Sequence, residues 1–248
     1  MDVQPFVYGE RPWLVSVDEP EVAAYFRAEG ALELFPVGAD IAFGRERRLY
    51  FIENGLVATI PEPGVGIARV VGLFGANTTL GLVRALRRGG GRMKLRAVTL
   101  SAVRTKTIPL DVFDDWLASQ PVELRMRVLQ NCISKSECQL EGVLVNDLQS
   151  VNARLLWLVE TLFVAAARPL EPGFAPLPWP ITISTLSMMA HTTREMASRG
   201  ISEWCREGVF KRDGRRLLDR KSQTFCCKYW NAFQKYGRYP LTMAQIIS

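Results

Sequence analysis

Short apolar runs alternate with turn-forming residues along the chain before Pro109. Glycine, proline and asparagine separate these runs, as in Pro36-Val37-Gly38 and Asn54-Gly55. A spacing of roughly ten residues between strands is typical of an antiparallel roll or barrel. A preceding stretch, residues 21–28, has the pattern of a short helix, with Asp18 as its start signal. The runs with the length and composition of strands are residues 31–35, 40–43, 49–52, 56–60 and 95–103.

After Pro109 the apolar residues recur with the period of a helix. Residues 110–117 fit a short helix, and Pro121 stands where the first turn of the next helix tolerates proline. From there to about residue 167 the chain has no further proline. This seam predicts a long helix that packs on its own domain or on the same helix of a second chain. Its members, at steps of four and three, are Leu144, Leu148, Val151, Leu155, Leu158 and Leu162.

The next segment, residues 168–180, is rich in proline and is interpreted as a linker into a second unit. Beyond it, residues 182–190 predict a short amphipathic helix. A turn at 191–193 then leads into a helix at 194–206, for which Thr193 is a suitable N-cap. Residues 209–218 alternate into a hairpin with a basic Asp-Gly turn.

The second of these helices exposes polar residues at its N-terminal end, which is the end that contacts base edges in a helix-turn-helix. Arginine can donate two hydrogen bonds to guanine, and Glu195 can accept one from the amino group of cytosine. Alternatively, Glu195 only orients Arg199. The residues expected to contact DNA are Thr182, Thr193, Arg194, Glu195, Ser198, Arg199, Lys211, Arg212 and Arg215.

Composition supports this interpretation. The 248 residues suffice for two domains, and a hydrophobic fraction of 48% suits buried cores. The net charge of +6 is compatible with a polyanion, although its placement says more than its sum. Basic residues outnumber acidic ones between Arg194 and Arg220, where phosphate contacts would lie.

Several classes of function are disfavoured. No apolar run has the length of a membrane span and no leader opens the chain, so we expect a cytoplasmic protein. Five cysteines without zinc or iron–sulfur spacing and a single histidine, His191, predict no metal site and no cofactor. No nucleophile–base pair stands out, so we expect no catalytic residues and no enzyme.

Residues 181–218 resemble the DNA-binding domain of the cyclic-AMP receptor / fumarate–nitrate reduction regulator (CRP/FNR) superfamily. The run Thr193-Arg194-Glu195-Met196-Ala197-Ser198-Arg199 matches the family's (S/T)-R-E-x-x-S-R pattern. The resemblance implies that Arg194, Glu195, Ser198 and Arg199 read a short half-site. His191 replaces a turn glycine of many members, and we expect it in a left-handed conformation.

The resemblance extends over about residues 35–218. Residues 35–38 are similar to the family's (Y/F)-P-x-G turn, residues 49–57 to a strand–turn–strand motif, and residues 112–117 to the helix that closes its roll. It implies an α+β fold: an N-terminal antiparallel β-roll like a cyclic-nucleotide-binding jelly roll, a long central dimerisation helix and a C-terminal winged helix-turn-helix. The hinge would fall near residues 146–148. The expected domains are 1–120 (roll), 121–147 (central helix), 148–221 (winged domain) and 222–248 (a C-terminal extension).

The same resemblance implies the partners. They are a second copy of the chain, double-stranded DNA with palindromic half-sites, RNA polymerase and a small-molecule effector. Cyclic AMP is disfavoured, because Ala76 replaces the glutamate that holds the ribose in the family, and Gly91 and Arg92 stand where an Arg-Ser pair would hold the phosphate. The candidate pocket lies between residues 74–80, 92–96 and the inner face of the 124–140 helix. Its candidate residues are Phe74, Asn77, Thr78, Arg92, Arg96 and Cys132.

Two alternatives to a ligand-responsive regulator stay open. The roll of a constitutive DNA-binding regulator would be only a dimerisation scaffold. A thiol-redox-controlled regulator would use Cys132 or Cys138 on the long helix.

Overall fold

The computed structural model describes residues 12–43, 47–62, 69–86, 94–166, 173–177, 179, 181–208, 210–213 and 216–221. The chain divides into two compact units. One is Trp13–Gly142, and the other combines Met1–Pro12 with Val143–Ser248. The boundary between the two units, at residues 142 and 143, falls inside the longest helix. From the sequence we expected a central dimerisation helix that begins at residue 121.

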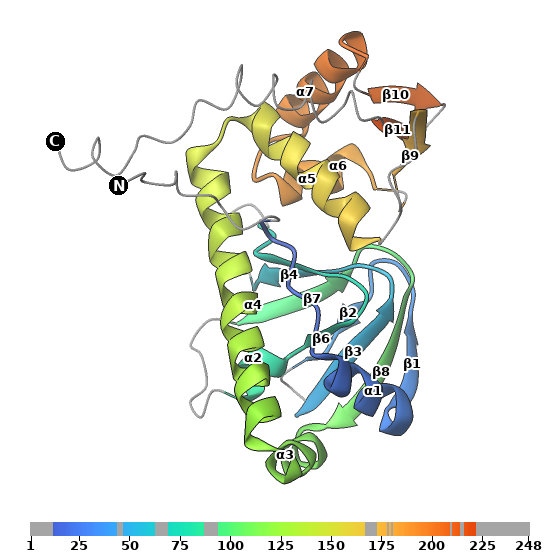
Figure 1. Cartoon of the computed structure of the whole chain (residues 1–248). Helices are drawn as coiled ribbons and strands as arrows, with labels where there is room; N and C mark the ends of the chain where they lie inside the picture. The colour runs from blue at the N-terminus through green and yellow to red at the C-terminus, as the bar shows by residue number, and fades with distance from the viewer. Residues whose placement is uncertain are drawn as a thin grey trace, which may run out of the picture. The chain divides into compact units, whose positions relative to one another are not determined.

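The unit Trp13–Gly142 is built on two four-stranded antiparallel sheets (Figure 1). Their strand orders are β1-β8-β3-β6 and β2-β7-β4-β5. The strands are β1 (Ala31–Phe35), β2 (Asp40–Ile41), β3 (Arg48–Asn54), β4 (Val57–Pro61), β5 (Gly72–Phe74), β6 (Thr78–Leu80), β7 (Leu95–Thr99) and β8 (Val103–Pro109). This antiparallel sandwich, together with a long helix beside it, gives the α+β architecture that the family resemblance implied.

The segment 95–103, expected as one strand, is in fact two strands in different sheets. β7 pairs with β2 and β4, whereas β8 pairs with β1 and β3. The chain crosses between the sheets at Ser101, whose buried Oγ accepts a hydrogen bond from the backbone N–H of Leu56 at 2.9 Å. A side chain that satisfies a backbone donor here lets the ladder stop and the chain change sheets.

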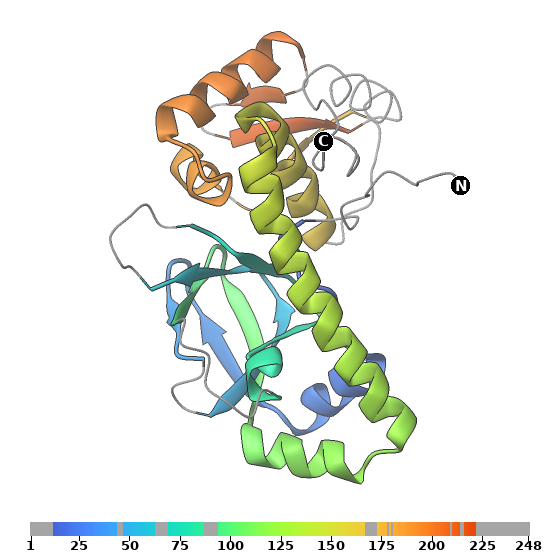
Figure 2. The ribbon, with the colours of Figure 1, turned by 90° about the vertical axis from the view of Figure 1, so that its left-hand side faces the viewer.

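Helices cover one sheet of the sandwich. They are α1 (Pro20–Glu29), α2 (Leu82–Ala85), α3 (Leu110–Ser119) and the first part of α4 (Val122–Leu148). Phe26, Phe51 and Phe113 meet in their shared core, with ring centroids 5.5 and 5.7 Å apart for the two pairs that include Phe26. A second core fills the space between the sheets around Ile52 and Phe74. Both views show α4 alongside the sandwich (Figures 1 and 2).

The helical pattern expected to run to residue 167 is interrupted. α4 ends at Leu148 and α5 (Val151–Ala165) begins after Ser150, whose Oγ accepts a hydrogen bond from the N–H of Ala153 at 3.3 Å. A serine in this role satisfies a free N–H of the first turn and favours a helix start. The break between the two helices, at residues 149 and 150, directly follows residues 146–148, where the resemblance implied a hinge.

The second unit contains α5, α6 (Ile183–Met189) and α7 (Arg194–Arg206). A three-stranded sheet of order β10-β11-β9 accompanies them. Its strands are β9 (Gly173–Pro176), β10 (Phe210–Asp213) and β11 (Arg216–Lys221). β9 was not expected, because it lies in the segment interpreted as a proline-rich linker and its pairing with β11 joins residues more than forty positions apart. The expected extension 222–248 lies outside the described residues.

Candidate nucleic-acid interface

The turn between α6 and α7 sets the angle between the two helices. Thr182 caps α6, since its Oγ1 accepts a hydrogen bond from the N–H of Thr185 at 3.1 Å. His191 has a φ of 47° in the turn, so the left-handed conformation expected for this residue is confirmed. The N–H of Thr192 then bonds to the carbonyl of Ser187 at 2.9 Å, which closes the turn.

α7 is strongly amphipathic. Thr193 caps it, as expected, because its Oγ1 accepts from the N–H of Met196 at 3.2 Å. One face is buried and consists of Ala197, Gly200, Ile201 and Trp204. The opposite face is free of such packing and carries charged and hydroxyl side chains. The helix thus packs its apolar face on the unit's core and leaves its polar face exposed.

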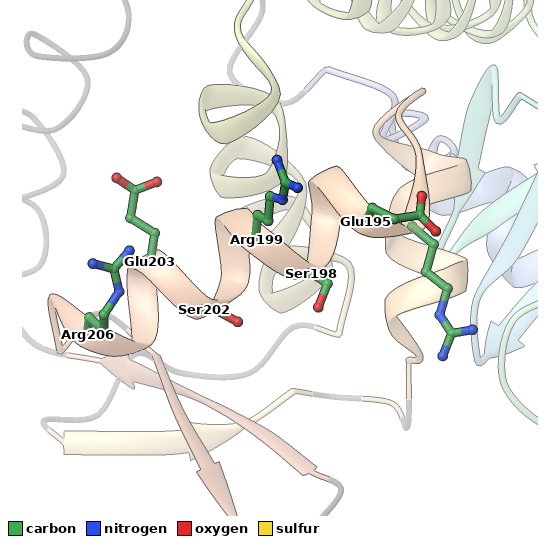
Figure 3. A pocket seen from close by; sticks show the side chains of 7 residues that line it. Glu195, Ser198, Arg199, Ser202, Glu203 and Arg206 are labelled. Carbon is green, nitrogen blue, oxygen red and sulfur yellow. The ribbon is translucent and has the colours of Figure 1, made fainter.

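The exposed face of α7 forms a shallow concave surface (Figure 3). Its lining consists of Arg194, Glu195, Ser198, Arg199, Ser202, Glu203 and Arg206. The first four are residues that the sequence motif selected. Figure 3 shows Ser198 and Ser202 pointing to the same side of the helix. The last three were missed, although their spacing of four from Ser198, Arg199 and Ser202 places them one turn further along the same face.

Glu195 remains an acceptor at neutral pH. Its pKa is lowered from the ordinary value by hydrogen bonds to its own backbone N–H and to the Thr193 side chain, with the charges of Arg194 and Arg199 adding to the effect. A free N–H at a helix N-terminus favours a negative charge in this position. The Glu195 carboxylate therefore stays ionised near Arg194 and Arg199, and this surface offers hydrogen-bond acceptors beside donors.

Residues of α5 contact both the His191 turn and α7. The Nη1 of Arg154 donates to the carbonyl of His191 at 3.3 Å and to the carbonyl of Asn146 at 2.8 Å. A Cβ added at Gly200 would lie 2.7 Å from Oδ1 of Asn152 and 2.9 Å from Cδ1 of Leu155. Only a glycine lets the two helices approach this closely. This glycine contact was not anticipated from the sequence.

The hairpin expected after α7 is formed by β10 and β11, with Asp213 opposite Arg216. Lys211 on β10 is exposed. Arg212 lies on the same strand, and Arg215 lies outside the described residues. β10 and β11 are extended into a three-stranded sheet by β9.

The described residues among those expected to bind an effector have different surroundings. Phe74 belongs to the core between the sheets, and Cys132 belongs to the core under the helices. Arg96 makes a bidentate pair with Asp40 on an exposed part of the sheet. Asn77 accepts a hydrogen bond from Arg27 at 2.6 Å.

Of the remaining two expected effector residues, Thr78 donates to the carbonyl of Gly75 at 2.7 Å. Arg92 lies outside the described residues.

Burial governs the thiols on α4. It raises the pKa of Cys132 to about 11, and it also raises the pKa of Cys138. Thiolates are the reactive form, so neither side chain has the environment of a reactive cysteine. Within the described ranges, no three or more His, Cys, Asp and Glu side chains are grouped so that they could hold a metal ion. No helix among the described residues has the length and hydropathy to cross a membrane.

Comparison with known proteins gave matches among solved structures alone. No protein-family model matches the chain, and no curated protein does. The global regulator CLP of Xanthomonas campestris, described as c-di-GMP responsive, is 16% identical with a TM-score of 0.63, over 82% of this chain and all of that one. FixK2 of Bradyrhizobium japonicum is 13% identical with a TM-score of 0.65, over 80% and 96%.

A third structural neighbour is a transcriptional regulator of the CRP/FNR family from Thermus thermophilus. It is 19% identical with a TM-score of 0.58, over 76% of this chain and 93% of that one. Each of the three matches spans most of both chains. The chain therefore has the fold of the CRP/FNR regulators.

Proposed function

We propose that the chain is a sequence-specific DNA-binding transcription regulator, in which α6, the His191 turn and α7 form a helix-turn-helix and β10 and β11 form its wing. The observation that carries the proposal is the exposed face of α7. It presents Arg194, Glu195, Ser198 and Arg199 at the N-terminal end of a helix whose other face is buried. A helix held in this way fits the major groove of B-DNA.

The chemistry of this face matches base edges. Arg194 and Arg199 can each donate two hydrogen bonds to O6 and N7 of a guanine, and the ionised Glu195 can accept from N4 of a cytosine. Ser198 can serve either base. Thr182, Thr193, Lys211, Arg212 and Arg215 would contact the backbone, where they position the protein without reading sequence.

The regulator would act as a dimer through α4. Apolar side chains are exposed along one side of this helix at steps of four, three, four and seven residues. They are Val122, Met126, Leu129, Ile133 and Leu140, with exposed fractions between 44% and 60%. This α4 stripe (Val122, Met126, Leu129, Ile133, Leu140) has the spacing of a coiled-coil seam. Two copies joined along it would present two α7 helices to the two half-sites of a palindrome.

The apolar seam expected at residues 144–162 is a different feature. Leu155, Leu158 and Leu162 are buried inside the second unit on α5. The domains that we propose are those expected from the sequence: a roll over residues 1–120, a dimerisation helix over 121–147, a winged domain over 148–221 and an extension over 222–248.

The roll would serve a regulator in one of two ways. It either changes the DNA affinity on binding a small molecule or acts as a dimerisation scaffold. Thermal unfolding against a metabolite library separates the two, because ligands that bind the folded state alone raise its stability saturably. RNA polymerase would be the further partner of an activator.

Selection of DNA from a random library by the purified full-length chain tests the proposal. We expect enrichment of a palindrome with two half-sites about one helical turn apart. Binding to the selected DNA should be about 10³-fold or more tighter than binding to random DNA at physiological salt. Equal affinity for selected and random sequences would overturn the proposal.

A further inference from the structure

We propose that residues 13–19, hereafter the strap, are a built-in substitute for an effector: they fill the space between the roll and α4 and hold the helix there without any bound small molecule. This inference concerns the regulation of the proposed DNA-binding function and rests on it. All the residues that carry it belong to the unit Trp13–Gly142.

The strap bonds to the roll on one side and to α4 on the other. The N–H of Leu73 on β5 donates to the carbonyl of Trp13 at 2.7 Å, and the N–H of Val15 donates to the carbonyl of Leu73 at 2.9 Å. The N–H of Trp13 donates to the carbonyl of Cys138 on α4 at 3.1 Å. The strap therefore joins β5 to the helix through its own backbone.

A buried charge pair fixes the other end of the strap. Nζ of Lys135 on α4 bonds to Oδ1 of Asp18, and both side chains are 1% exposed. Oδ2 of Asp18 accepts from the hydroxyl of Thr79 on β6 at 2.6 Å. The N–H of Asp18 donates to the carbonyl of Asn77 at 2.8 Å. A buried charge is tolerated only when it is paired and hydrogen-bonded. A shift of this end of the strap would therefore leave Asp18 or Lys135 as a charge without its partner, which is unfavourable.

The indole of Trp13 closes the space at the opposite end. Trp13 is 1% exposed, and a Cβ added at Gly142 would lie 2.3 Å from its Cδ1. Gly142 thus leaves the room that the ring occupies. Trp13 also has a φ of 70°, in the left-handed region that favours glycine. The fold tolerates this backbone cost at a residue whose ring fills a place between helix and roll.

The strap bonds to two of the three walls between which the sequence placed an effector pocket, residues 74–80 and the inner face of α4; the third expected wall was residues 92–96. Asn77 and Thr79 on that rim bond to Asp18 of the strap, and Lys135 does so from the helix. The strap contacts and the α4 stripe lie on opposite faces of α4. Holding the helix by the first face therefore keeps the second one turned outward for another copy of the chain.

Replacing Trp13 by glycine tests this role and separates the ring from the backbone. The Trp13→Gly variant relieves the left-handed φ and leaves a cavity of indole size, and such apolar cavities can bind an aromatic molecule of matching shape. We expect hydrogen exchange of the α4 amides at residues 128–142 to speed up about tenfold or more, and affinity for the selected DNA to fall by a similar factor. Millimolar indole should restore both.

The control is Val17→Gly, which changes an exposed residue of the same strap. It should leave α4 exchange and DNA affinity within about twofold of wild type, with no response to indole. Should Trp13→Gly fail to fold, Trp13→Phe supplies a graded test, in which α4 exchange should be faster and DNA affinity lower than in wild type, each by less than about tenfold.

Unchanged α4 exchange and DNA affinity in Trp13→Gly, or in Trp13→Phe where the glycine variant does not fold, would overturn the strap's role. An indole effect on wild type and on Val17→Gly as large as the effect on Trp13→Gly would do the same. If the wild-type chain binds no DNA specifically, the proposed function fails, while the exchange measurement still decides whether the strap holds α4.

Discussion

The side-chain amide of Asn152, at the start of α5, donates a hydrogen bond from Nδ2 to Oε2 of Glu203 on α7 at 2.9 Å. The other end of the same amide, Oδ1, lies where it would meet a Cβ at Gly200 at 2.7 Å. Asn152 therefore touches α7 at two positions on adjacent turns. Two contacts of this kind fix the rotation of α7 about its own axis, and with it the direction in which the DNA-reading side chains point.

Gly200→Ala should disturb that rotation. The added methyl meets both Asn152 and Leu155, so α7 must shift away from α5. Overpacking of this kind costs about 1–3 kcal/mol of unfolding free energy. Urea unfolding measures this cost, and titration of the selected DNA measures the loss of specific affinity. Asn152→Ala in the Gly200→Ala background should restore part of both.

Gly208→Ala is the matched control for that change. Gly208 follows α7 with a φ of 73°, and a Cβ there would meet nothing within 4 Å. Its substitution should cost about 1–2 kcal/mol through backbone strain alone. Specific DNA affinity should be kept once the protein is folded. A loss of specificity as large as that of Gly200→Ala would contradict the role given to the α5–α7 contact.

Arg199→Ala and Lys211→Ala should weaken DNA binding in different ways. Arg199 lies on the concave face of α7, so its loss should cost about 1–3 kcal/mol on the selected DNA and far less on random DNA. Lys211 is exposed on β10, and its loss should weaken both alike and reduce the salt slope by about one. Titrations at several salt concentrations on both DNAs measure this. Equal losses for Arg199→Ala on the two DNAs would show that it contacts phosphate.

Local patterns were sufficient to predict much of the fold. β1 and α7 lie where alternation and periodicity placed them, and Thr193 caps the helix that its side chain suggested. What the sequence did not reveal depends on partners far along the chain. β9 exists because β11 pairs with it, and the change of sheet at Ser101 depends on a hydrogen bond to Leu56. Neither the β9–β11 pairing nor the hydrogen bond between Ser101 and Leu56 produces a periodic pattern in the sequence.

For individual side chains too, the sequence showed the roles that depend on near neighbours and missed those that depend on distant partners. The motif found Arg194, Glu195, Ser198 and Arg199, because these residues follow one another on one helix. Asp18 shows the opposite case: it has the sequence position of a helix start, yet α1 begins at Pro20 after Glu19 and Asp18 pairs with Lys135 instead. A buried ion pair between residues more than a hundred positions apart outweighs a cap, and spacing along the chain cannot show it.

Cys132 should make the stability of the chain pH-dependent in the alkaline range. Burial raises its pKa from 9.0 to about 11, so the folded state keeps a proton that the unfolded state loses. The stabilisation is therefore fully present below pH 9 and is lost as the pH rises towards 11. Its size is about 2–3 kcal/mol. Unfolding of wild type and Cys132→Ala at pH 8, 9, 10 and 11 should show a steeper loss for wild type. Parallel curves would contradict this.

The same burial predicts the response to thiol reagents. Cys132 and Cys138 should react slowly in the folded chain at pH 8, and at the rate of free cysteine in denaturant. Mass spectrometry of the labelled peptides measures each rate. Fast folded-state modification of Cys132, together with loss of DNA binding that Cys132→Ser abolishes, would instead favour thiol-redox control.

Ile133→Glu should separate the proposed dimer into monomers. Ile133 is 60% exposed in the middle of the α4 stripe, so a carboxylate there costs an isolated chain little. In a dimer it would be buried opposite its own copy, and two unpaired charges in an apolar seam are strongly unfavourable. Sedimentation equilibrium should therefore show a mass near 27.9 kDa instead of twice that value. Ser134→Glu adds the same charge to an exposed neighbour outside the stripe and should remain dimeric.

The monomeric variant also tests how the two half-sites are read. Each Ile133→Glu monomer keeps a complete α7, so it should still bind a single half-site with the sequence preference of wild type. It should lose the extra affinity for the full palindrome, because joining two readers makes the second contact intramolecular. Binding to DNA with one and with two half-sites, at equal salt, measures that difference. A variant that stays dimeric, or a monomer that retains the wild-type advantage for two half-sites, would show that α4 does not join the subunits.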